Sequence, residues 1–152
     1  MSPHLNCFDF LPTFAELTGA PLPERTLDGE SIASLIETGN KERTKPLIWA
    51  FYNSRNQHVI AMRTDEWKIL GRLESDTAYL PKLNNIYNGN EVLVKEAELS
   101  DFVLYNMKED IGEAKNVATN YPEVFEEMKE QLKIEYAALL EGSHVWNRKE
   151  SN

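Results

Sequence analysis

Cysteine is almost absent from this chain of 152 residues, and a single Cys7 excludes an intramolecular disulfide or a multi-cysteine metal site. No run of about 18 apolar residues occurs, so the sequence predicts no helical membrane span. Basic residues are the minority, and the formal net charge of −9 argues against a nucleic-acid partner, because phosphates favour clustered cations. Residues 1–6 lack the basic and apolar regions of a signal peptide. We therefore expect either a cytoplasmic protein or an internal piece of an exported one.

The short motifs that mark common catalytic sites are also missing. The sequence has no glycine-rich phosphate loop, no H-E-x-x-H zinc motif, no calcium loop and no G-x-S-x-G element. Cys7 lies in the apolar stretch C-F-D-F-L, which favours a buried, inert thiol over a nucleophile. We therefore predict no catalytic residue, no metal site and no cofactor in this chain.

Three histidines remain as candidates for acid–base chemistry. His4 and His144 lie in terminal segments, where we expect no chemical role. His58 follows a polar loop that contains Asn53 and Arg55. It is either a binding or acid–base residue at the end of a strand, or a polar strand residue at the solvent edge. The residue pattern leaves both interpretations open.

Apolar residues make up 41% of the chain and charged residues 27%, a balance typical of a folded domain with its own core. Residues 58–63 and 67–72 are rich in Val, Ile, Met and Trp, and the polar turn T-D-E separates them, which predicts a β-hairpin with one packed face. The long side chains of Arg63 and Lys68 beside the turn are expected to cover apolar surface while their charges stay solvated.

Two further strands and a second hairpin are expected. Residues 47–52 are apolar on both faces, which predicts a central strand of the sheet. Residues 102–106 form a strand at or near the sheet edge. The pair Asn88-Gly89 predicts a turn between short strands at 85–87 and 92–94.

Apolar spacings of three and four predict helices at 7–18 and 31–37 and a long final helix that begins at Pro122 and ends at Gly142. Asp9 is the expected cap of the first helix, and the charged run 41–45 is expected to be a solvated loop. The predicted fold class is α+β. It comprises a small antiparallel sheet of about four strands with the long C-terminal helix on one face, preceded by short N-terminal helices.

Three stretches, taken in order, resemble the C-terminal part of the sulfatase family in the alkaline phosphatase-like superfamily. Residues 9–19, D-F-L-P-T-F-A-E-L-T-G, with L-D-G-E-S-I at 27–32, are similar to the segments that close the family's catalytic domain. Residues 61–70, A-M-R-T-D-E-W-K-I-L, resemble its R-T-x-x-W/Y-K hairpin. Residues 104–118, L-Y-N-M-K-E-D-I-G-E-A-K-N-V-A, resemble L-Y-D/N-L-x-x-D-P-x-E-x-x-N-L-A.

The resemblance implies a division of the chain into three parts. Residues 1–45 would be the end of the catalytic α/β domain, 46–142 the small C-terminal sheet-and-helix domain, and 143–152 a flexible tail. Sulfatases hydrolyse sulfate esters with a formylglycine made in a C-x-P/A-S-R motif and with a divalent cation, usually calcium. Cys7 is not in such a motif. The resemblance therefore implies that formylglycine and calcium belong to a catalytic domain outside this chain, and that the chain alone is inactive.

The resemblance also suggests partners and a lesser site. Loops of the family's small domain border the substrate cleft, which makes His58, Arg55 and Asn53 candidates for the substrate rim. The expected partner is the N-terminal sulfatase catalytic domain. The apolar faces of the helices within 9–37 would be exposed without it, which favours a homo-oligomer. Sulfatases are usually exported. The alternative function is a stand-alone binding or interaction module that shares this fold.

Overall fold

A computed structural model describes residues 4–40, 43–54, 57–74 and 86–147 of the chain. The described chain forms two compact units, which we treat separately. Unit 1 comprises Met1–Leu47 with Arg63–Asp65, and unit 2 comprises Ile48–Met62 with Glu66–Asn152. No helix among the described residues is both long and apolar enough to cross a membrane.

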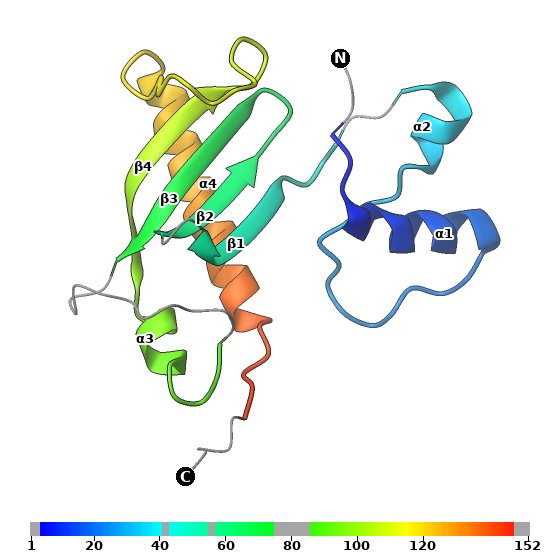
Figure 1. Cartoon of the computed structure of the whole chain (residues 1–152). Coiled ribbons are helices and arrows are strands. Elements are labelled where there is room, and N and C mark those ends of the chain that lie inside the picture. The colour runs from blue at the N-terminus through cyan, green and yellow to red at the C-terminus, as the bar shows by residue number, and fades with distance from the viewer. Residues whose placement is uncertain (1–3, 41–42, 55–56, 75–85, 148–152) are drawn as a thin grey trace. The chain divides into compact units, whose positions relative to one another are not determined.

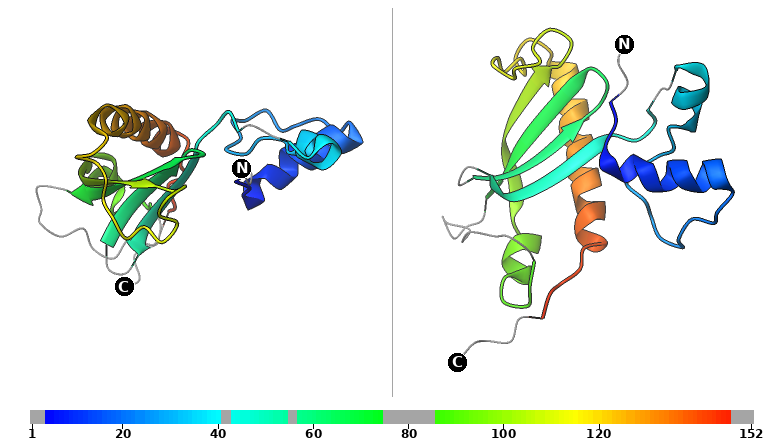
Figure 2. Two further views of the ribbon diagram at one scale, coloured as in Figure 1. Left: turned by 90° about the horizontal axis from the view of Figure 1, so that it is seen from above. Right: turned by 45° about the vertical axis from the view of Figure 1, so that its right-hand side comes forward.

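Unit 2 is a four-stranded antiparallel sheet with a long helix on one face, which confirms the predicted α+β class (Figures 1 and 2). The strand order is β1-β2-β3-β4, so each strand lies beside its neighbour in sequence. The strands are β1 (Leu47–Ser54), β2 (Gln57–Arg63), β3 (Trp67–Glu74) and β4 (Glu98–Asn106), followed by the helix α4 (Pro122–Glu141). Proline at the first position of α4 costs no hydrogen bond, because that amide has no partner within the helix.

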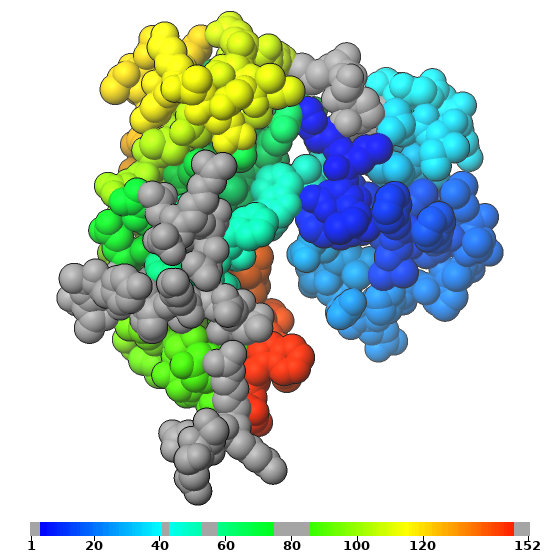
Figure 3. Space-filling view, in the orientation of Figure 1, coloured from blue at the N-terminus to red at the C-terminus, as the bar shows by residue number. Residues whose placement is uncertain are grey.

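Unit 1 carries the short N-terminal helices. They are the 3-10 turn η1 (Cys7–Asp9), α1 (Phe10–Thr18) and α2 (Ala33–Thr38). Both α1 and α2 end at a glycine in the left-handed conformation, Gly19 at φ 71° and Gly39 at φ 75°. Figure 3 shows atoms of α1, in dark blue, at the surface of this unit. Ile36 is 64% exposed, because α2 is short and buries chiefly its first turn.

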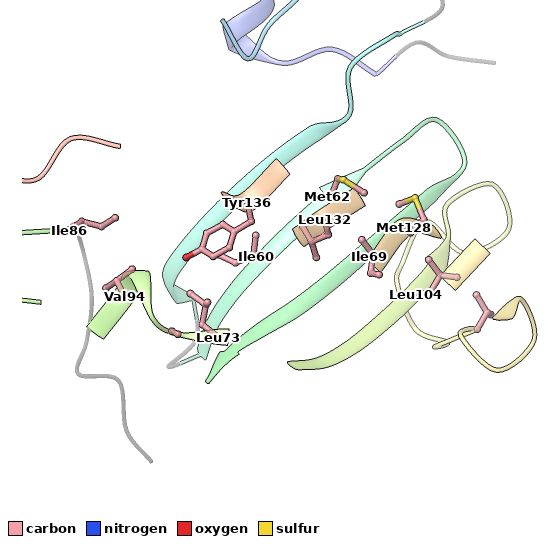
Figure 4. Close-up of a cluster of buried hydrophobic side chains, with 12 residues drawn as sticks. Ile60, Met62, Ile69, Leu73, Ile86, Val94, Leu104, Met128, Leu132 and Tyr136 are labelled. Atoms are coloured by element: carbon pink, nitrogen blue, oxygen red, sulfur yellow. The ribbon is translucent and has the colours of Figure 1, made fainter. Parts of the chain in front are cut away.

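The core of unit 2 lies between the sheet and α4 (Figure 4). Alternate residues of the central hairpin face α4, and the helix contributes the stripe that its sequence period predicts. The buried members of the cluster are Ile60, Met62, Ile69, Leu73, Ile86, Val94, Ala97, Leu104, Val117, Met128, Leu132 and Tyr136. The predicted hairpin with one packed face is therefore confirmed.

Two strand predictions are wrong. The strand β1 is an edge strand and not a central one, and Phe51 on it is 57% exposed. Residues 92–94 lie in the helix α3 (Glu91–Lys95), where Val94 donates its backbone amide to Asn90. An apolar run this short shows no periodicity that would distinguish a strand from a turn of helix. The helical conformation is therefore set by tertiary packing, in which Val94 is fully buried.

The described part of the segment after α4 pairs with the loop before α3. Trp146 forms a parallel bridge with Tyr87 and donates its backbone amide to Ile86. The His144 and Trp146 rings pack edge to face with centroids 4.7 Å apart. Residues 148–152 of the predicted tail lie outside the described residues.

Candidate functional site

His58 stands near the start of β2 and is half-buried. Its ring Nδ1 hydrogen-bonds the carbonyl oxygen of Tyr52 on β1, so this nitrogen must carry the proton and donate. The contact holds the ring of His58 against the backbone of β1. Of the other two rim candidates, Arg55 lies outside the described residues, and Asn53 is described only as part of the backbone of β1. The joint placement of the three rim candidates stays a prediction.

A tyrosine pair lies beside His58 in the core of unit 2. Tyr136 on α4 donates its hydroxyl proton to the Tyr52 hydroxyl across 3.4 Å. Burial raises the pKa of both hydroxyls, and the hydrogen bond to Tyr52 raises the pKa of Tyr136 further. Both phenols are therefore neutral at physiological pH, and they connect α4 to β1, whose Tyr52 carbonyl hydrogen-bonds His58 on β2.

The two cations of the hairpin make contacts within the scaffold. Lys68 Nζ lies 2.5 Å from Glu113 Oε1 in unit 2. Arg63 Nη2 lies 2.9 Å from His4 Nε2 in unit 1, and Arg63 Nε is buried with no hydrogen-bond partner among the described residues. Burial, followed by the nearby carboxylates of Glu113 and Asp110, raises the pKa of Tyr105. Both cations therefore contact other residues of the scaffold, but the buried Nε of Arg63 corrects the expectation that its charge stays solvated.

Strained backbone in unit 2 coincides with ion pairs to β3. The described non-glycine residues with positive φ are Asp101, at 46°, and Glu113, at 55°. Glu113 pairs with Lys68, and Asp101 pairs with Arg72 across 3.1 Å. Asp101 lies within β4 at the register shift between β3 and β4, Glu113 lies in the loop before α4, and each side chain pairs with a cation of β3.

Sequence reasoning missed a buried polar cluster in unit 1. The carboxylate of Asp9 is fully buried and accepts two bonds from the guanidinium of Arg43, at 2.8 and 2.9 Å. It also accepts the backbone amides of Asn6, at 2.8 Å, and Glu30, at 3.1 Å. Asp9 occupies the N-cap position of α1, as predicted, but its side chain makes no cap bond to that helix. Arg43, expected in a solvated loop, has a side chain only 8% exposed.

The electrostatics of Asp9 identify this cluster as structural. Burial by itself raises the pKa of the carboxyl, but the hydrogen bonds from Arg43, Asn6 and Glu30 and the charge of Arg43 outweigh it and lower the pKa. The four bonds occupy both carboxylate oxygens. The pairing of residues 34 positions apart has no periodic sequence pattern, so only the resemblance of residues 9–19 to a family motif pointed to Asp9.

No metal or nucleophilic site emerges from the described residues. Among them, no group of three or more His, Cys, Asp or Glu side chains could hold a metal ion. Cys7 is exposed rather than buried, which corrects the expectation of a buried thiol. A cavity of about 620 Å³ in unit 1 is lined by Pro12, Arg25 and Lys45 among others. Lys45 Nζ there already donates to the carbonyl of Leu27, at 2.8 Å.

Comparisons with known proteins were made on sequence and on structure. No protein-family model matches the chain. Human arylsulfatase A is 34% identical over 140 residues, which cover 86% of this chain and 26% of the relative. A sulfatase of Formosa agariphila is 28% identical over 123 residues, 78% of this chain and 19% of the relative. A structure from Bacteroides fragilis, described as a candidate sulfatase, superposes with a TM-score of 0.54 at 17% identity, over 83% of this chain and 23% of that one.

The sequence and structure comparisons match similar shares of this chain and of its relatives. The chain spans about a quarter of the length of the first curated relatives that it matches. The structural likeness, at low identity, supports the fold, and the sequence likeness supports the relationship. The chain belongs to the sulfatase family and corresponds to its C-terminal portion.

Proposed function

We propose that this chain serves as the C-terminal subdomain of a sulfuric ester hydrolase and supplies scaffold and substrate rim. The observation that carries the proposal is the 34% identity with human arylsulfatase A over most of this chain and a quarter of that enzyme. The chemistry of the described residues agrees with it. The buried carboxylate of Asp9 is saturated by four hydrogen bonds, and Lys68 is paired with Glu113.

The catalytic groups are assigned to another part of the enzyme. In this proposal formylglycine and calcium belong to an N-terminal α/β domain, and that domain is the partner of this chain. Residues 1–45 are the end of the same α/β domain, and residues 46–142 are the small C-terminal domain. A homo-oligomer is the alternative partner arrangement.

The rim role is assigned to His58, Asn53 and Arg55. His58 supports it because its Nδ1 is held by the Tyr52 carbonyl, which orients the ring at the end of β2 that adjoins the 53–56 loop. A guanidinium at a cleft edge suits a sulfated substrate, since it donates several hydrogen bonds to the sulfate oxygens.

The test is hydrolysis of 4-nitrophenyl sulfate by two proteins. One is this chain alone, and the other is human arylsulfatase A with its matching C-terminal part replaced by this chain. We expect no hydrolysis by the chain alone and measurable hydrolysis by the chimera. Hydrolysis by the purified chain alone would refute the assignment of the catalytic groups. A chimera that folds but stays inactive would refute the subdomain role.

A stand-alone binding module is the second candidate function. It is favoured by the complete core of unit 2, whose sheet and helix bury twelve side chains. Binding of a sulfated ligand such as heparin by the isolated chain, together with an inactive chimera, would select this function.

A further inference from the structure

The cavity of unit 1 has the size of a small-molecule site. It is formed by α1, by Lys45 and by residues 19–32, which join α1 to α2 and which we call the α1–α2 connection. Figure 1 shows the connection as a wide loop. All lining residues belong to unit 1, and the volume of about 620 Å³ falls in the range of ligand pockets, about 300–1,000 Å³.

The wall of the cavity is held in place by contacts within unit 1. The ring of Pro23 locks its own φ, and its carbonyl accepts the backbone amide of Arg25 at 2.8 Å. Lys45 Nζ donates to the carbonyl of Leu27, also at 2.8 Å. The connection is therefore fixed at two points along the cavity, and a ligand would meet a site that is already formed.

Much of the lining is apolar. Pro12 and Ala15 of α1 are buried in the unit, and their small side chains leave the space that the cavity occupies. Leu22 and Leu27 of the connection also line it, and Leu22 is 48% exposed. A ring or short chain placed in the cavity would remove this apolar surface from water.

Two cations, Arg25 and Lys45, line the same cavity. Lys45 has three N–H donors, and the carbonyl of Leu27 occupies one of them. Arg25 is exposed, and no hydrogen bond or ion pair joins its side chain to another described residue. Both cations therefore retain donors for a ligand.

The lining carboxylates differ from each other in their contacts. The oxygens of Glu30 accept the amide and the hydroxyl of Thr44, at 2.9 and 2.7 Å, and lie 3.6 Å from Arg43 Nε. Glu16, exposed on α1, is the second carboxylate of the lining. Because Glu30 is engaged by its neighbours, two cations and one carboxylate remain to meet a ligand, which favours an anion.

We propose that this cavity binds a small organic anion. Its head group lies on Arg25 and Lys45, and its apolar body lies against Leu22 and Leu27. The head group is an oxyanion, either a carboxylate or a sulfate ester, because guanidinium and ammonium groups donate hydrogen bonds to both. The site needs no catalytic group, so it does not depend on the proposed function.

The test is a titration of the full isotope-labelled chain, followed by its amide chemical shifts. The probes are 2-naphthyl sulfate, 2-naphthoate and the cation 2-naphthylmethylammonium, which share a ring system and differ in the head group. We expect at least one of the anions to shift the amides of residues 20–31 and 45 with a Kd below about 1 mM, and the cation to bind at least about tenfold more weakly. The two anions show which oxyanion the site prefers.

Three variants test the role of the cation. Arg25→Gln removes one charge, and the side chain has no contact with a described residue to lose. Arg72→Gln is the matched control, because Arg72 is an exposed arginine of unit 2. We expect Arg25→Gln to raise the Kd of the anion at least about fivefold, and Arg25→Lys and Arg72→Gln to change it less than about twofold.

Four results would overturn the inference. They are no shift with any probe at about 10 mM, shifts confined to unit 2, equal anion affinities of the wild type and Arg25→Gln, and a cation that binds as tightly as the anions. The last result would identify Glu16 as the anchor. Binding is measured on the chain alone, so an inactive chimera would refute the proposed function and leave the anion site standing.

Discussion

Removal of the Asp9 carboxylate should open unit 1 and leave unit 2 intact. The substitution Asp9→Asn keeps the size of the side chain but leaves the guanidinium of Arg43, which is 8% exposed, without its counter-charge. Arg43→Met is the reciprocal change, which leaves the buried carboxylate with two backbone amides as donors. The double variant removes both charges.

The magnitude follows from the burial of the pair. Loss of one partner from a buried, hydrogen-bonded ion pair costs about 3–5 kcal/mol, because the remaining charge stays desolvated. The two single changes should therefore each lower the free energy of opening of unit 1 by about 3 kcal/mol. The double variant should be less destabilised than the sum by about 2 kcal/mol, since neither charge is left unpaired.

The assay must distinguish the two units. All three tryptophans, at positions 49, 67 and 146, belong to unit 2, so tryptophan fluorescence reports unfolding of that unit only. Amide hydrogen exchange of residues 10–18 reports α1 in unit 1. We expect exchange of this helix to be faster by on the order of a hundredfold in Asp9→Asn, with an unchanged fluorescence transition.

The pH dependence of the same exchange gives a second check. Because the pKa of Asp9 is lowered in the folded state, its contribution to stability is fully present above the unfolded value of about 3.9 and is lost as the pH falls through the folded value. Protection of α1 should therefore decrease below about pH 4 in the wild type and not in Asp9→Asn. Equal exchange in wild type, Asp9→Asn and Arg43→Met at neutral pH would show that the ion pair does not hold unit 1 together.

Two further predictions concern single side chains. Leu132→Ala, on the buried side of α4, should destabilise unit 2 by about 2–5 kcal/mol in denaturant unfolding followed by fluorescence. Ile134→Ala, on the exposed side of the same helix, should cost less than about 1 kcal/mol. Similar losses of stability in the two variants would contradict the packing of α4. Gly29→Ala should disrupt unit 1, because a Cβ would lie 2.0 Å from the Phe8 carbonyl oxygen, and faster exchange of residues 10–18 measures the effect. Gly142→Ala, with 3.7 Å to its nearest neighbour, should be tolerated and leave the fluorescence transition of unit 2 unchanged.

The hairpin and α4 could be predicted from the sequence, because the spacing of their apolar residues matches the pattern of burial in the structure. The hairpin alternates with period two, and α4 repeats its apolar residues every three or four positions between a proline and a glycine. The side-chain oxygen of Asn116 accepts the backbone amides of Leu104, at 3.1 Å, and Ala118, at 3.0 Å. Each of these features is set by neighbours within about a dozen residues.

Features that depend on distant residues were not predictable. Whether β1 is central or at the edge is decided by its neighbours in the sheet, and its apolar outer residues Trp49 and Phe51 misled the prediction. The Asp9–Arg43 pair joins segments 34 residues apart, and a charged loop gives no indication that one of its cations is buried. The rim likewise depends on the segment 53–58, which includes the end of β1 and the start of β2 and whose sequence shows polarity but no geometry.

The contacts explain why the three motifs identify a family without showing a mechanism. In unit 1, Asp9 from the first motif accepts the amide of Glu30 from the L-D-G-E-S-I segment, and Gly29 of that segment admits the Phe8 carbonyl. In unit 2, Lys68 from the hairpin motif pairs with Glu113 from the third motif. The motif residues are therefore one another's partners, and their order and spacing follow from the fold. A substitution at any of these motif residues should lower the free energy of unfolding. Hydrolysis by the chimera should then decrease only in proportion to the fraction of protein that is unfolded.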